Sequence, residues 1–159
     1  MSVAIRQAVK GDEKLVVDFI FALAKCEKLG HEVEADKVDI ARDLFGPSPR
    51  VFCEIAEIEG KPIGFALWYY TYSTFRGKHG IWLEDLFVDP EVRGKGAGKA
   101  LMAYLAAKCC NEGLARLEWW VLNWNEPSID FYKSPGAIMQ DEWSVCRIDD
   151  DALKRLGAE

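Results

Sequence analysis

The sequence is poor in histidine and has no cysteines at metal-binding spacing. It contains two histidines, His31 and His79, which lie far apart, and its five cysteines include no Cys-x-x-Cys pair. We therefore expect no metal site, because metal centres use ligands at close and regular spacing. Five unpatterned cysteines indicate reduced thiols, which are typical of the cytosol. A Gly-x-Ser-x-Gly sequence is also absent, so nothing indicates a serine hydrolase.

Long apolar runs and excess positive charge are missing as well. The stretch 1–14 is charged, unlike a signal peptide, and the apolar stretch 15–24 contains Asp18 and is too short to span a bilayer. We predict a cytoplasmic protein without a membrane partner. Twenty Lys and Arg against 26 Asp and Glu give a net charge of −6, which argues against nucleic acid as the partner.

The chain has 159 residues, and half of them are hydrophobic. This length and composition predict one globular domain over residues 1–159. Hydrophobic periodicity predicts helices after Asp12 to Cys26, at 36–45, from the glycines near 96 to about 111, at 126–133 and at 150–156. Strands are expected at 2–7, 51–58, 63–72, 81–88 and 115–122, with a polar loop at 73–80. A last hairpin is expected from 136–139 and 143–148. This order of elements predicts an α/β fold.

The most informative segment is the glycine-rich turn Arg93-Gly94-Lys95-Gly96-Ala97-Gly98, which lies between a predicted strand and a predicted helix. Glycines let the backbone approach a ligand closely, and the first turn of a helix offers unpaired N–H groups to an anion. The spacing fits neither the dinucleotide fingerprint nor the Walker A loop, which also needs a hydroxyl after its lysine. A phosphate cradle and a plain surface turn both remain open on these glycines alone.

Two adjacent acids, Glu84 and Asp85, lie inside the apolar strand that precedes this turn. Strand alternation predicts that they point to opposite faces, so that only one faces a site, and that Trp82 shares the face of Glu84. Burial of unpaired charge is costly, so the alternatives are a proton-transfer role, a salt bridge or an edge position.

Arg-x-x-Gly-x-Gly after a strand that ends in Val88-Asp89-Pro90 resembles the acetyl-CoA motif of the GNAT N-acetyltransferases. The resemblance implies the GNAT fold, a mixed and mostly antiparallel sheet with splayed central strands flanked by helices. It also implies acetyl-CoA as cosubstrate, with no metal. Coenzyme contacts are then expected from the backbone of the strand end and from the turn, namely Leu86, Phe87, Val88, Arg93, Gly94, Lys95, Gly96, Ala97, Gly98 and Lys99.

Further blocks resemble the spermidine/spermine and thialysine N-acetyltransferase branch: 65–72, 83–88, and Trp124-Asn125-Glu126-Pro127-Ser128-Ile129 with Phe131-Tyr132-Lys133. The resemblance implies Tyr132 as the acid that protonates the coenzyme thiolate and Glu84 as the group that serves the substrate amine. It also implies that Asn125 and Tyr132 contact the coenzyme. The acetyl group is expected to be transferred directly within a ternary complex, and the protein is expected to be a homodimer. Substrate contacts are expected from Glu27, Trp82, Glu84, Asp85 and Asp141.

The polyamine enzymes tend to carry Tyr where this chain has Cys26. They also tend to carry an Asp-Pro-aromatic turn where this chain has Ser73-Thr74-Phe75. Shorter amines and thialysine therefore compete with spermidine and spermine as the predicted substrate. Acetylation of a protein or peptide amine, or a non-catalytic acyl-CoA-binding module, are the alternative functions.

Overall fold

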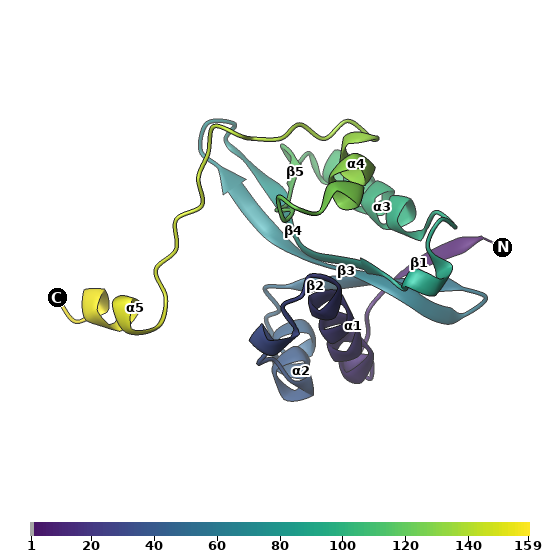
Figure 1. Ribbon diagram of the computed structural model, residues 1–159, viewed down its shortest axis with the longest axis horizontal. Coiled ribbons are helices and arrows are strands. Elements are labelled where there is room, and N and C mark those ends of the chain that lie inside the picture. Colours follow the sequence, from purple (N-terminus) through teal and green to yellow (C-terminus); the bar gives the residue numbers. More distant parts are fainter. Residues whose placement is uncertain (1) are drawn as a thin grey trace. The chain divides into compact units, whose positions relative to one another are not determined.

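The computed structural model describes residues 2–159, and the chain divides into two compact units, Met1–Trp120 and Val121–Glu159. The first unit holds a five-stranded sheet with three helices (Figure 1). Its strands are β1 (Val3–Gln7), β2 (Phe52–Ile58), β3 (Lys61–Ser73), β4 (Lys78–Val88) and β5 (Leu117–Glu118). Its helices are α1 (Glu13–Cys26), α2 (Lys37–Phe45) and α3 (Ala97–Glu112), with short 3-10 turns η1 (Gly30–Glu32) and η2 (Pro90–Val92).

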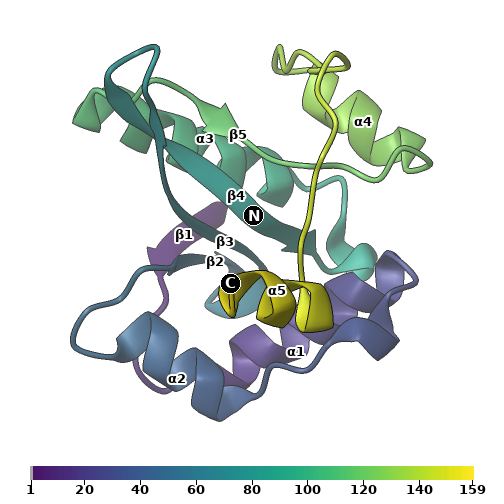
Figure 2. The ribbon, with the colours of Figure 1, turned by 90° about the vertical axis from the view of Figure 1, so that its left-hand side faces the viewer.

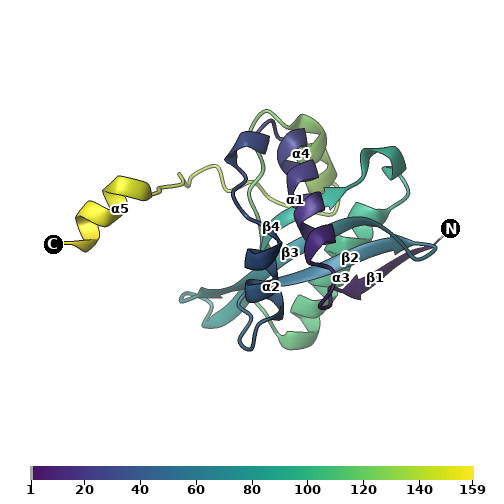
Figure 3. The same ribbon diagram turned by 90° about the horizontal axis from the view of Figure 1, so that it is seen from below.

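The sheet runs in the order β1-β2-β3-β4-β5, antiparallel up to β4, and β5 joins β4 in parallel. Helices α1 and α2 cover one face and α3 covers the other, as the two turned views show (Figures 2 and 3). The predicted mixed and mostly antiparallel α/β fold is confirmed.

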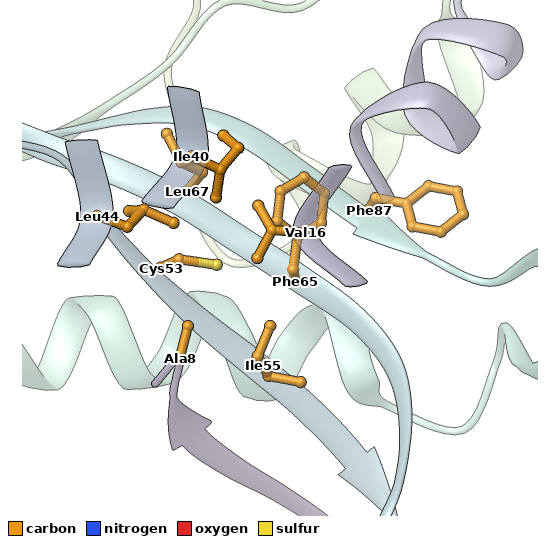
Figure 4. Close-up of a cluster of buried hydrophobic side chains, with 9 residues drawn as sticks. All are labelled: Ala8, Val16, Ile40, Leu44, Cys53, Ile55, Phe65, Leu67 and Phe87. Atoms are coloured by element: carbon orange, nitrogen blue, oxygen red, sulfur yellow. The ribbon is translucent and has the colours of Figure 1, made fainter. Parts of the chain in front are cut away.

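The core between the sheet and the pair α1 and α2 fixes the ends of the strands that approach the glycine-rich turn. The ring of Phe19 on α1 stacks on Phe65 of β3 at 5.5 Å and meets Phe87 of β4 at 5.7 Å. Burial of such side chains stabilises the fold by about 1.5–3 kcal/mol each. Figure 4 shows the cluster, which consists of Ala8, Val16, Ile40, Leu44, Cys53, Ile55, Phe65, Leu67 and Phe87.

A β-bulge interrupts β4 at Glu84. Leu67 of β3 lies opposite Asp85 and Trp68 lies opposite Leu83, so Glu84 is an extra residue without a partner across the ladder. A bulge reorients the side chains beside it and increases the local twist. It lies just beyond the point where β4 leaves β5.

Strand β4 pairs with β5 only at Ile81 and Trp82. The rest of β4, as far as Val88, pairs with β3 on one edge and with no strand of residues 2–159 on the other. The two strands therefore part after two residues, as the resemblance led us to expect. Beyond Trp82, the edge of β4 that β5 leaves has no strand of residues 2–159 beside it.

Some predicted boundaries were wrong. Half of the expected loop 73–80 belongs to the strands of a longer β3–β4 hairpin, in which only residues 74–77 form the turn. The ladder continues because Tyr72 lies opposite His79, with their rings 4.9 Å apart. Strand β5 is much shorter than the predicted 115–122. The hairpin expected from 136–139 and 143–148 is not formed, because an isolated hairpin needs a third strand or a helix to pack on.

The second unit contains α4 (Glu126–Lys133) and α5 (Asp150–Gly157). The predicted cap of α4 is confirmed, because Oδ1 of Asn125 accepts a hydrogen bond from the Ser128 backbone N–H at 3.4 Å, and Pro127 lies in the first turn. No residue of this unit is buried. Over residues 2–159, no helix has the length and apolar character needed to cross a membrane.

Candidate active site

The glycine-rich turn leads directly into α3. Gly94 and Gly96 have φ of 83° and 86°, values that residues with a side chain rarely adopt, and no heavy atom lies within 4 Å of where a Cβ would stand at either glycine. Gly96 is the N-cap and supplies no side chain, so the N–H groups of the first turn of α3 are not capped. The turn thus leaves an open, glycine-lined helix N-terminus without an acidic residue, which fits a pyrophosphate.

Arg93 attaches this turn to its neighbours. Its Nε donates a hydrogen bond to the Val88 backbone oxygen at 3.1 Å, and its Nη2 lies 3.9 Å from Sγ of Cys26 at the end of α1. One guanidinium group therefore connects the end of β4, the turn and α1. Lys95 and Lys99 are exposed on the same segment and add positive charge beside the helix N-terminus.

The predicted backbone contacts lie on the free edge of β4. Leu86, Phe87 and Val88 pair with Ala66, Phe65 and Gly64 of β3 on one side only. Gly64 is required here, because a Cβ would come within 2.4 Å of the Phe87 backbone oxygen. The strand end, the turn and the helix N-terminus follow one another as a continuous polar backbone surface.

Three carboxylates gather beside this edge. Burial, and then the charges of Glu84 and Glu27, raise the pKa of Asp85 to about 7. Desolvation also raises the pKa of Glu27, which forms the C-cap of α1. The expectation that Glu84 and Asp85 face opposite sides was wrong, because the bulge breaks the alternation between them. Perturbed acids in one cluster are typical of functional sites that handle protons or cations.

An aromatic pocket of about 340 Å³ adjoins Glu84 and is lined by Tyr69, Thr71, Trp82, Glu84 and Trp120. The indole Nε1 of Trp82 donates a hydrogen bond to Oε2 of Glu84 at 2.8 Å. The prediction that these two side chains share a face is confirmed. The bond fixes the orientation of the Glu84 carboxylate and leaves Oε1 for another donor.

The remaining predicted residues belong to the second unit. Asn125 uses its Oδ1 as the cap of α4, so Nδ2 is the atom with which it would donate a hydrogen bond to a ligand. Tyr132 is half-buried on α4, with its ring 5.3 Å from that of Phe131, and Asp141 is exposed. Their predicted roles with the coenzyme and substrate stay predictions.

Sequence reasoning missed Tyr69 and Trp120 as site residues. Tyr69 belongs to an aromatic-rich strand in which alternation alone does not tell which face meets a ligand. Trp120 follows the short β5, and the residue is 60% exposed. An exposed tryptophan is the useful signal, and only the structure gives exposure.

No group of three or more His, Cys, Asp or Glu side chains suited to a metal ion occurs among residues 2–159. The profile of the Acetyltransferase (GNAT) family matches residues 17–136. The chain therefore belongs to the GNAT family of acetyltransferases, enzymes that use acetyl-CoA as cosubstrate.

Individual relatives agree with this assignment. The chain is 34% identical over 168 residues to the thialysine N-epsilon-acetyltransferase of cattle (Bos taurus). The alignment covers 99% of this chain and 98% of the cattle protein. It is 32% identical to the human spermidine/spermine N(1)-acetyltransferase-like protein 1, over 98% of this chain and 24% of the longer human protein. A solved integron cassette protein from the mobile metagenome of V. cholerae superposes with a TM-score of 0.81 and 29% identity, over 100% of this chain and 99% of that one.

Proposed function

We propose that the chain transfers the acetyl group of acetyl-CoA to a primary amine of a small diamine, polyamine or thialysine-like substrate. The observation that carries this proposal is the cluster of Glu27, Glu84 and Asp85 beside the free edge of β4. Carboxylates at this position attract a substrate with more than one ammonium group, next to a backbone surface suited to the coenzyme. The names of the cattle and human relatives support the same substrate class.

The proposed chemistry follows from the demands of amide formation. Glu84 accepts a proton from the ammonium group, directly or through water, and the freed amine nitrogen attacks the thioester carbonyl. Backbone N–H groups of Leu86, Phe87 or Val88 donate to the oxygen that becomes negative, and the C–S bond then breaks. Tyr132 donates a proton to the leaving thiolate. The nitrogen thus gains the acetyl group directly, within a ternary complex and without an acyl-enzyme.

In this proposal the coenzyme pyrophosphate lies on the N-terminus of α3. The first-turn N–H groups from Ala97 to Lys99 hold it, with Lys95, Lys99 and Arg93 as the flanking positive charges. The positive φ values at Gly94 and Gly96 support this assignment, because they favour residues without a side chain, and this leaves the cradle open. Asn125 and Asp141 are proposed to contact the coenzyme and the substrate respectively.

We also propose a homodimer. The unit Val121–Glu159 contains no buried residue, and its apolar side chains at Ile138, Trp143, Val145 and Ile148 are all more than half exposed. Surfaces of this kind are typical of association sites. A cytosolic location is proposed because the five cysteines are all free thiols. Light scattering at several protein concentrations tests the dimer.

The test of the main proposal is acetyl-CoA-dependent release of coenzyme A across a panel of amines. The panel contains spermidine, spermine, 1,3-diaminopropane, thialysine, lysine and a basic peptide. We expect turnover with the small diamines, polyamines or thialysine and little with the peptide. Preferential turnover of the peptide would assign the site to protein amines, and release of coenzyme A that is independent of any amine would contradict the proposal.

A further inference from the structure

The pocket beside Glu84 is lined largely by aromatic rings. The rings of Trp82 and Trp120 meet edge to face, with centroids 5.1 Å apart and planes at 85°. Tyr69 extends the wall, with its ring 6.5 Å from that of Trp82. All of these side chains belong to the unit Met1–Trp120, and with Glu84 and Thr71 they line an open pocket of about 340 Å³.

Aromatic faces arranged around one carboxylate attract cations. The π-system of each ring is negative at its face, so a cation gains energy above it, and indole gives the largest effect. Glu84 adds a negative charge at the wall, and the nearby Asp85 and Glu27 belong to the same acidic cluster. An apolar guest without charge would gain from burial against the rings but not from these charges.

The predominance of aromatic surface over hydrogen-bond acceptors selects the kind of cation. A primary ammonium group has three N–H donors, each of which needs an acceptor when it leaves water. In this pocket Oε2 of Glu84 already accepts from Trp82. Its Oε1 and the hydroxyls of Thr71 and Tyr69 are the further side-chain acceptors, and the rest of the lining is largely aromatic ring. An alkylated ammonium group has fewer donors, and its charge is spread over carbon atoms that contact the rings.

We infer that Tyr69, Trp82 and Trp120 form an aromatic cage for an N-alkylated ammonium group of the substrate, a second nitrogen that is not acetylated. Trp120 is the residue that determines this specificity. The inference rests on the proposed function, because the acceptor amine then lies at Glu84. Since Glu84 also lines the cage, a short aliphatic spacer joins the two nitrogens of the preferred substrate.

The test compares two amines that differ only in charge at the caged end. One is 3-aminopropyl-trimethylammonium, and the other is 4,4-dimethylpentylamine, in which a tert-butyl group replaces the trimethylammonium group. We expect wild-type kcat/KM to favour the charged amine by about tenfold, the size of a cation–π contribution of about 1–2 kcal/mol. A preference for the neutral amine, or equal values, would overturn the cage.

Variants of Trp120 separate the π-system from simple apolar contact. Trp120→Leu keeps an apolar side chain but removes the ring, so the ratio of the two kcat/KM values should fall about fivefold or more. Trp120→Phe should keep most of the ratio. Phe75→Leu is the matched control, because Phe75 is fully exposed at the β3–β4 turn and should leave the ratio unchanged. An unchanged ratio in Trp120→Leu would contradict the role of this residue.

A binding measurement distinguishes failure of the cage from failure of the proposed function. Tetramethylammonium has no amine to acetylate, so its binding does not depend on catalysis. We expect it to shift the NMR signal of the Trp120 indole N–H, identified by its absence from Trp120→Phe. A shift without acetylation of any amine would support the cage and overturn the proposed function. Acetylation of an amine without a shift would support the function and overturn the cage.

Discussion

The protonation of Asp85 makes the stability of this fold depend on pH in a defined direction. Burial, with the charges of Glu84 and Glu27, raises its pKa from 3.8 to about 7. Between these values the folded chain keeps the carboxyl proton and the unfolded chain releases it. The unfolded state then binds fewer protons, so the free energy of unfolding falls as pH rises. The stabilising contribution is complete below pH 3.8 and is lost by about pH 7.

The perturbation that isolates this effect is Asp85→Asn, since an amide has nearly the shape of the protonated acid and does not ionise. A difference of about three between the two pKa values corresponds to about 4 kcal/mol at most. The free energy of unfolding of the variant should therefore rise relative to that of the wild type by about 1.4 kcal/mol per pH unit from pH 4 to pH 7. Above about pH 7 this difference in free energy of unfolding, called the gap below, should stay constant.

Urea unfolding of both proteins at pH 5, 6, 7 and 8 measures the gap. Burial also raises the pKa of Glu54, a carboxylate in the core, but that contribution is common to both proteins and cancels in the difference. Glu91→Gln, which removes an exposed carboxylate, is the control for a general change in net charge. A gap between Asp85→Asn and wild type that stays constant across this pH range would refute the reasoning.

Three further outcomes follow from the proposed site. Tyr132→Phe should lower kcat by roughly 10²–10⁴, as measured by coenzyme A release with chemistry rate-limiting, and an unchanged kcat would remove the phenol from the mechanism. Glu84→Gln should lower kcat about 10²-fold and abolish the acid limb of the pH–rate profile, whereas a wild-type profile would assign the base elsewhere. Gly96→Ala, at a φ of 86°, should cost about 1 kcal/mol of stability and raise KM for acetyl-CoA about tenfold; thermal melting and saturation kinetics check both, and an unaltered KM would contradict the cradle.

The turn and the helix after it were predictable because glycine has a direct physical consequence. Gly94 and Gly96 adopt the positive φ that their missing side chains permit, and Gly113 ends α3 in the same conformation. The cap at Asn125 was predictable for a similar reason, since its side chain bonds the backbone of its own helix. Local sequence decides features whose partners lie within a few residues.

Features that depend on distant partners were not predictable. The missing hairpin after residue 136 has strand-like residues but no sheet to join, and the brief pairing of β5 depends on where β4 turns away. The aromatic pocket brings together Tyr69 of β3, Trp82 of β4 and Trp120, which follows β5. Alternation states which residues of one strand share a face, but not which segments from elsewhere in the chain meet that face.

The bulge at Glu84 connects the acidic cluster with the cage. In a regular strand Glu84 and Asp85 would point apart, and the acids would be divided between the two faces of the sheet. With one residue inserted, Asp85 lies opposite Leu67 while Glu84 accepts the hydrogen bond from Trp82. Two carboxylates held this close in a partly buried site disfavour one another's charge, as the raised pKa of Asp85 reflects. A substrate with two positive nitrogens relieves this repulsion, whereas a monoamine relieves only part of it. The bulge thus favours dicationic amines through the same electrostatic cost that lowers the stability of the ligand-free fold above pH 4.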